Sequence, residues 1–92
     1  MIGLAKGQQI LDKIKVQSKM GLGTLYLLDT GIAAEAFGNG LFLELDYGEI
    51  LSNAVKKDSL VISWTEEVST YDIKFNIKNA AEVVQKINQY KK

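Results

Sequence analysis

The chain of 92 residues is electrically balanced and lacks the side chains that most catalytic and metal sites use. It contains eleven lysines, no arginine and eleven acidic residues, so its formal net charge is zero, and it has no histidine and no cysteine. A neutral chain is not typical of nucleic-acid-binding proteins, which carry an excess of positive charge. The absence of histidine and cysteine excludes Ser-His and Cys-His catalysis, thiolate chemistry and the usual zinc ligands. We therefore expect a protein that is not an enzyme and that holds no metal and no cofactor.

A chain of this length folds around one hydrophobic core, and we expect a single domain that spans residues 1–92. Apolar residues make up 47% of the chain, but no run of them approaches the roughly 18 residues that a membrane-spanning helix needs. The opening segment, Met1–Lys6, does not have the layout of a signal peptide. We expect a soluble, cytoplasmic protein in which residues 1–9 form an N-terminal arm, either a loose segment or a turn of helix.

The first half of the chain predicts four strands joined by turns that contain glycine. From Ile10 to Val16 apolar residues alternate with polar ones, as in a strand with one buried face, and Asp12 is the exception to the pattern. Thr24–Leu28 is almost wholly apolar, which is typical of a strand covered on both faces. The turn signals that follow the first three strands are Met20–Gly23, Asp29–Gly31 and Gly38–Gly40. The third and fourth predicted strands are Ile32–Phe37, with Glu35 facing solvent, and the run in which Leu41, Leu43 and Leu45 share one face.

The second half predicts three more strands, for a total of seven between residues 10 and 77. The fifth, Ile50–Val55, follows a break in the pattern and alternates poorly, so we expect one of its apolar pairs to be exposed or covered by another segment. In the sixth strand Leu60, Ile62 and Trp64 share a face, and a polar loop, Glu66–Thr70, follows. The seventh strand, Tyr71–Ile77, has the clearest alternation. We interpret its aromatic residues and Trp64 as core rather than as a platform for stacking bases.

The last segment predicts the only amphipathic helix, over residues 79–91. Its apolar residues recur at the spacing of one helical face, and they are Ala80, Val83, Val84, Ile87 and Tyr90. Asn79 is a suitable N-cap, and Glu82 lies three residues later, where a capping box has its second carboxylate. A helix of this length is marginal alone in water, so we expect its apolar stripe to dock on the strands.

Three stretches resemble the pleckstrin-homology superfold, in particular its small GRAM and bacterial PH-like branches. Gly7-Gln8-Gln9-Ile10-Leu11 resembles the Gly-Glu-x-Ile-Leu opening of those domains. Gly23–Ile32 resembles their hairpin G-x-L-Y-L-T-D-x-G-L, with Leu28 in place of the usual threonine, and Leu45–Ile50 resembles I-P-Y-x-D-I. The resemblance covers nearly the whole chain. It implies a mainly β fold in which two near-orthogonal antiparallel sheets form a bent seven-stranded barrel capped by the C-terminal helix.

One motif suggests an enzyme instead. Leu27-Leu28-Asp29-Thr30-Gly31 resembles the catalytic signature of dimeric retroviral-type aspartic proteases, in which two aspartates share a proton. The chain lacks the glycine-rich flap and the second hydrophobic-hydrophobic-Gly segment that those enzymes need. We therefore interpret Asp29 as a turn residue and keep the protease as a remote alternative.

The lysines of the first hairpin suggest a membrane-surface role as the principal alternative. Lys13, Lys15 and Lys19 lie where phosphoinositide-binding PH domains have a cationic motif, but no arginine is present for bidentate phosphate contact. Lys13 and Lys15 also alternate with apolar residues, as on any solvated strand face. The three lysines are therefore possible contacts to anionic lipid without a specific pocket.

The fifth strand is the predicted partner site. It has no proline and no inward charge, which are usual devices that protect an edge strand. In PH-like folds this strand lies beside the C-terminal helix, where related domains accept an extended peptide as an added strand. We expect Leu51, Asn53 and Val55 to bind a protein segment or a second copy of the chain, unless the loop Tyr47–Glu49 folds over them. The predicted function is that of a non-enzymatic PH/GRAM-like binding or adaptor module.

Overall fold

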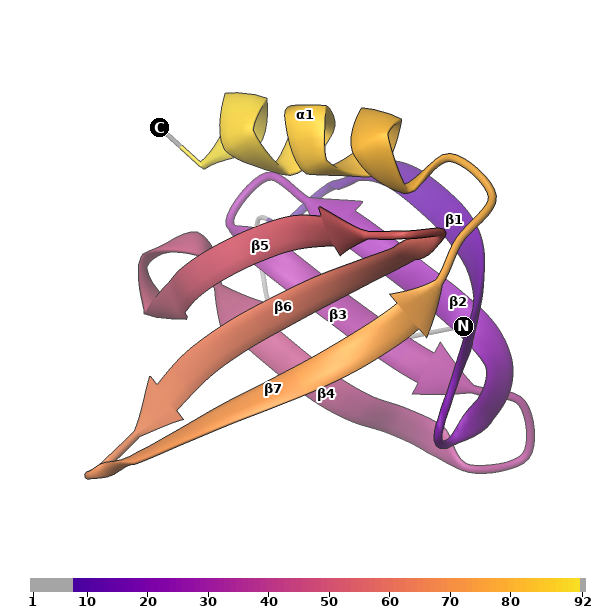
Figure 1. Ribbon diagram of the computed structural model, residues 1–92, viewed down its shortest axis with the longest axis horizontal. Coiled ribbons are helices and arrows are strands. Elements are labelled where there is room, and N and C mark those ends of the chain that lie inside the picture. Colours follow the sequence, from indigo (N-terminus) through magenta and orange to yellow (C-terminus); the bar gives the residue numbers. More distant parts are fainter. Residues whose placement is uncertain (1–7, 92) are drawn as a thin grey trace.

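The computed structural model describes residues 8–91 and contains seven antiparallel strands followed by one helix (Figure 1). The strands are β1 (Ile10–Ser18), β2 (Gly21–Leu28), β3 (Gly31–Ala36), β4 (Gly40–Asp46), β5 (Ile50–Lys56), β6 (Ser59–Glu66) and β7 (Ser69–Asn76). A 3₁₀ turn, η1 (Tyr47–Glu49), joins β4 to β5, and the helix is α1 (Ala80–Tyr90). The predicted mainly β fold with one C-terminal helix is therefore confirmed.

All seven strands belong to one sheet in the order β4-β3-β2-β1-β7-β6-β5. Within residues 8–91, the two halves of the sheet, β1–β4 and β5–β7, pair with each other only where Gln17 of β1 lies opposite Asn76 of β7. In Figure 1 the strands β5–β7 lie in front of β2–β4 and cross their direction. The bent arrangement in two layers agrees with the predicted mainly β fold. The predicted barrel is not closed, because the edge strands β4 and β5 do not pair with each other.

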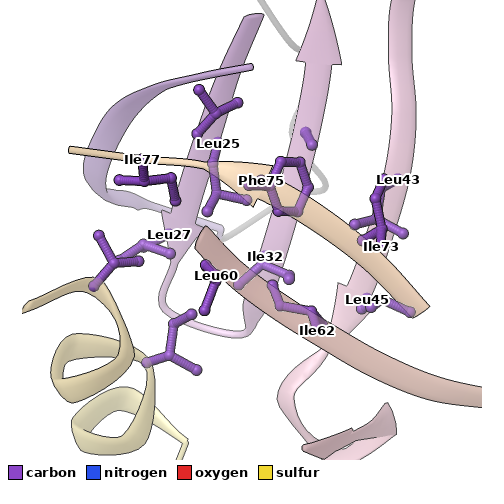
Figure 2. Packing of buried hydrophobic residues seen from close by; sticks show 14 of the residues in the cluster. Leu25, Leu27, Ile32, Leu43, Leu45, Leu60, Ile62, Ile73, Phe75 and Ile77 are labelled. Atoms are coloured by element: carbon purple, nitrogen blue, oxygen red, sulfur yellow. The ribbon is translucent and has the colours of Figure 1, made fainter. Parts of the chain in front are cut away.

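The core lies between the two halves of the sheet (Figure 2). Leu25 and Leu27 of β2 meet Phe75 of β7 there, and all three side chains are fully buried. Because side chains alternate across a strand, every second residue of β6 and β7 reaches the same space. Leu60 and Ile62 supply the β6 contribution, as their shared face predicts.

The second part of β2, Thr24–Leu28, is covered on both faces, as its continuous apolar run predicts. The second face carries a smaller cluster of Tyr26, Leu28 and Ala33. The Tyr26 hydroxyl donates a hydrogen bond to the carboxylate of Glu35, and this bond together with burial raises the pKa of Tyr26. The Tyr26 hydroxyl and the Glu35 carboxylate are therefore hydrogen-bond partners on this second face of the sheet.

Helix α1 lies across one end of the two halves and completes the core (Figure 1). Its buried stripe consists of Ala80, Val83 and Ile87, as predicted. The predicted capping box is wrong: the Asn79 side chain makes no capping hydrogen bond, and Asn79 only accepts the Val83 N–H through its backbone carbonyl. Glu82 instead forms an ion pair with Lys86 one turn later. Docking of the stripe, and not a side-chain cap, therefore sets where this helix begins.

Two predicted faces are wrong because bulges interrupt the alternation of the strands. A register shift between Ile10 and Asp12 moves Ile10 to the outer face, where it packs on the Tyr26 cluster. A second shift, at the β3–β4 pairing, leaves Leu41 exposed and turns Phe42 toward the core. A bulge inserts one extra residue, so every apolar position beyond it changes face relative to a strict period of two.

The predicted polar loop Glu66–Thr70 is also wrong. Strands β6 and β7 run almost to each other and are joined by a two-residue turn, Glu67 and Val68. Glu67 has φ of 55°, a conformation in which glycine is usual, so no glycine signal marks the turn. The longer hairpin places Tyr71 near its tip, where the ring is 46% exposed and stacks on Trp64 rather than lying in the core.

The substitution Ile87→Ala tests how far the fold depends on the helix stripe. Ile87 is fully buried, so removing its side chain leaves a cavity and should lower the free energy of unfolding by about 2 to 5 kcal/mol. Chemical denaturation monitored by Trp64 fluorescence measures the change. Gln85→Ala, at an exposed position of the same helix, is the control and should stay within about 0.5 kcal/mol. A loss below about 1 kcal/mol for Ile87→Ala would mean that the helix is not part of the cooperative core.

Candidate functional site

Strand β5 is an edge of the sheet and offers unpaired backbone groups. It pairs with β6 on one side only. A two-residue turn joins the strands, so Lys56 and Ser59 form the hydrogen-bonded pair that closes the hairpin. Backbone groups then alternate along the strand between the β6 side and the open side. Asn53 and Val55 therefore direct their N–H and C=O groups away from β6, where an added strand can pair with them.

Some apolar side chains of β5 are buried and others are exposed, as the poor alternation of this strand predicts. Ile50 is buried in the core, whereas Leu51 is 58% and Val55 is 41% exposed. A register shift between Ile50 and Ser52 marks a bulge at Leu51, which ends the regular part of the edge on that side. The turn η1 does not cover these residues: the Tyr47 ring is buried in the core, and its hydroxyl donates a hydrogen bond to the Leu28 carbonyl. That burial raises the pKa of Tyr47 to about 12.

Asn53 carries a buried oxygen without a partner beside the helix. Its side-chain Nδ2 donates a hydrogen bond of 3.2 Å to Oδ1 of Asn88 on α1, while its own Oδ1 is buried and accepts no hydrogen bond. An unsatisfied buried acceptor destabilises a protein by roughly 1 to 3 kcal/mol, and this one is closed off from solvent, so it offers no acceptor to an external ligand. A hollow of about 380 Å³ lies between the β5–β6 turn and the start of α1, away from Asn53, and its lining includes Val55, Asp58 and Ala81.

The structure does not bring the three predicted lipid-contact lysines into one pocket. Lys13 and Lys15 are exposed and lie opposite Tyr26 and Thr24 in β2. Both line a hollow of about 310 Å³ whose lining also includes Lys78, Lys86 and the carboxylates of Asp12 and Glu82. Lys19 lies in the β1–β2 turn and lines two other hollows. The three predicted lysines therefore do not converge on one site, and the hollow that holds Lys13 and Lys15 also carries carboxylates, which oppose an anion.

Asp29, the residue of the protease-like motif, lies exposed in the β2–β3 turn. Its Oδ1 accepts a hydrogen bond of 3.0 Å from the Gln9 N–H, and its own N–H donates to the Gln9 carbonyl at 3.1 Å. Thr30 accepts a further hydrogen bond from Gln8. These bonds attach the segment before β1 to the turn. The rest of the predicted arm, residues 1–7, lies outside the described residues.

An ion pair joins the helix to the first strand. Asp12, the exception in the alternation of β1, lies on the core side of the strand opposite Leu27 and pairs with Lys86 of α1. The Lys86 ammonium holds the pKa of Asp12 below its usual range, and the same contact raises the pKa of Lys86. A charged residue in an otherwise apolar pattern is thus explained by a partner from the helix.

An aromatic hollow at the end of the molecule away from α1 is absent from the predicted sites. Its volume is about 270 Å³, and its lining includes Met20, Phe42, Trp64 and Tyr71. The bulge that turns Phe42 inward and the short β6–β7 turn create it, and neither has a clear signal in the sequence.

Within residues 8–91 no group of three or more carboxylates is placed to hold a metal ion, and no helix is long and apolar enough to cross a membrane. A scan against protein-family models finds no match, and a search of curated proteins finds no relative.

The lowered pKa of Asp12 predicts an acid-dependent loss of stability. A carboxyl group whose folded-state pKa lies below its usual value of 3.8 stabilises the fold above that pH, and the contribution disappears as pH falls through the folded-state pKa. Asp12→Asn should therefore lower the free energy of unfolding at pH 7, and the difference from the parent should shrink below about pH 4. Urea unfolding at several pH values measures it, with Asp72→Asn on exposed β7 as control. A difference that is the same at pH 2.5 and pH 7 would contradict the ion-pair explanation.

Proposed function

We propose that this chain is a non-enzymatic binding module of the pleckstrin-homology and GRAM-like kind, which binds an extended protein segment along β5. The observation that carries the proposal is an edge strand with free backbone groups next to a docked helix. The order of the elements, two meanders of four and three strands followed by a C-terminal helix, supports the family resemblance.

Two features of β5 supply the parts that strand addition needs. The backbone groups of Asn53 and Val55 form main-chain hydrogen bonds with an incoming strand. The exposed side chains of Leu51 and Val55 offer apolar contact. Main-chain bonds give such a site affinity with little sequence preference, and the side-chain contacts add selectivity.

The proposal includes no catalytic residue and no cofactor. Asp29, the one candidate, is committed to the turn by its bond to the Gln9 N–H. The proposed module is cytoplasmic, and its role is to hold a partner.

A display library of random nine-residue peptides supplies a probe for β5. Selected peptides should bind, and on binding the amide hydrogens of Asn53 and Val55 should exchange more slowly, because they become paired. Val55→Lys and Asn53→Pro should each abolish binding, the first by placing a charge at the edge and the second by removing an outward N–H. The measurements are fluorescence anisotropy of labelled peptide and amide exchange by mass spectrometry.

Val68→Lys is the matched control, since Val68 is 97% exposed at the tip of the β6–β7 hairpin, away from the helix end. It should leave peptide binding unchanged. If bound peptide protects other amides and leaves Asn53 and Val55 exchanging as before, β5 is not the binding site.

Exposed apolar residues near Lys19 favour a second candidate, binding to an anionic membrane surface. Leu22 is 62% and Phe37 is 70% exposed, and the two are held together by a 2.9 Å hydrogen bond from the Phe37 N–H to the Leu22 carbonyl. Apolar side chains at turns, with lysines nearby, suit weak insertion into a charged lipid surface.

The double substitution Lys15→Glu and Lys19→Glu should weaken co-sedimentation with vesicles of phosphatidylserine and phosphatidylcholine, equally for all anionic headgroups. Lysines act as point charges, so the attraction should also fall with added salt. Lys56→Glu with Lys91→Glu gives the same charge change elsewhere and should have less effect. Tight binding to one phosphoinositide that survives ~0.3 M salt would show a specific pocket instead.

A further inference from the structure

Strand β7 has an open edge where the two halves of the sheet separate. It pairs with β6 along its whole length, whereas β1 pairs with it only through Gln17 and Asn76. Because β1 ends at Ser18, no strand within residues 8–91 lies beside the rest of β7 on that side. In Figure 1 the tip of the β6–β7 hairpin, at the lower left, lies well away from β1. A hollow of about 430 Å³ lies between the end of β1 and this edge of β7.

The backbone of β7 presents hydrogen-bonding groups to this hollow. Backbone groups alternate along a strand between its two sides. The Ile77 N–H donates to the Asp58 carbonyl, on the β6 side, so the odd-numbered residues of β7 direct their groups toward β6. Asp72 and Lys74 therefore direct their N–H and C=O groups to the open side, and both residues line the hollow. Free backbone groups in a row fit an extended polypeptide, which can add to the sheet as a strand.

The aromatic hollow that contains Trp64 and Tyr71 lies beside the same edge, because it shares three lining residues with the larger hollow. They are Lys19, Asp72 and Ile73. Facing residues of neighbouring strands place their side chains on the same face of a sheet. A side chain opposite the buried Ile73 therefore points to the core side, where the aromatic hollow lies. Trp64 Nε1 already donates to Glu66 at 3.2 Å, so the hollow suits an apolar side chain.

The charges on the other face of β7 define what the added strand carries there. Asp72 and Lys74 are exposed, and within residues 8–91 neither forms an ion pair. Their partners in β6 are the uncharged Ser63 and Val61. Lys19 lines the hollow together with Lys74, so positive charge gathers at one end of the open edge and negative charge at the other. Two opposite charges select a segment with the complementary order, whereas like charges block an edge.

We infer that the open edge of β7 binds an extended segment of a partner polypeptide that reads acidic, apolar, basic, apolar from its N-terminus. The segment runs antiparallel to β7 and continues the line of β1. Its four residues lie opposite Lys74, Ile73, Asp72 and Tyr71, in that order. This site is separate from β5 and goes beyond the proposed function.

A second copy of the chain does not fit this edge. Asp72–Phe75 has the required order, so the charges of a second β7 would match. In such a pair, however, Thr70 of one copy would lie beside Asn76 of the other, and Gln17 already occupies that position. A separate segment without a neighbouring strand avoids this collision.

Labelled peptides test the inference. The peptide Ser-Glu-Leu-Lys-Val-Thr should bind, and the amide hydrogens of Asp72 and Lys74 should then exchange more slowly. The peptide Ser-Lys-Leu-Glu-Val-Thr, with the charges exchanged, should bind about 3- to 30-fold more weakly. Serine in place of the leucine should weaken binding by about 10-fold, because the aromatic hollow is then left unfilled. Fluorescence anisotropy measures affinity, and mass spectrometry measures amide exchange.

A charge swap in the chain tests the register. Asp72→Lys with Lys74→Asp should move the preference toward the second peptide by about 3- to 30-fold. Both positions are exposed, and circular dichroism checks that the variant is folded. Glu44→Lys with Lys56→Asp makes the same exchange at exposed positions of β4 and β5, and it should keep the original preference.

Absence of binding up to ~1 mM peptide, or equal affinity for the two charged peptides, would overturn the inference. Protection of Asp72 and Lys74 that rises with protein concentration alone would show that a second copy occupies the edge, and would also overturn it. Protection of Asn53 and Val55 in their place would overturn it as well, while the proposed function at β5 would stand.

Discussion

Docking of the α1 stripe on the core is the contact on which the rest of this fold depends. The sheet is open, and its two halves meet along one narrow seam at Gln17 and Asn76. At one end, Val83 and Ile87 fill the space between the halves. The ion pair from Lys86 to Asp12 adds a polar link between the helix and β1. Without the helix, apolar residues of both halves would face water at this end.

The same docking defines the candidate binding edge. Helix α1 contacts β5 through the hydrogen bond between Asn53 and Asn88. Strand β6 pairs with one side of β5, and no strand pairs with the other side. Strand β4, the opposite edge, carries exposed Glu44 and Asp46, and charged side chains protect an edge from pairing. Of the two edges, β5 is therefore the one suited to a partner.

The sequence predicts the number of strands, their order along the chain and the helix, because periodicity and glycine turns determine these features locally. It fails where a bulge changes the register: nothing in Leu11 or Phe42 signals that an extra residue interrupts the alternation. The Asn79 cap also fails, since tertiary docking outweighs a weak local preference.

Some features of the candidate site can be predicted from the sequence, and others cannot. The unpaired edge and its exposed apolar residues can be predicted from the poor alternation of Ile50–Val55. The orphaned oxygen of Asn53 cannot, because it depends on Asn88, which lies 35 residues later.

Native-state hydrogen exchange of the helix tests the central claim most directly. If docking of α1 completes the core, the amides of Val84 and Ile87 should exchange only when the whole domain unfolds, with the same free energy and denaturant dependence as Leu25 and Ile62. If those helix amides exchange through a local opening several kcal/mol below global unfolding, the helix is an accessory and the account is contradicted.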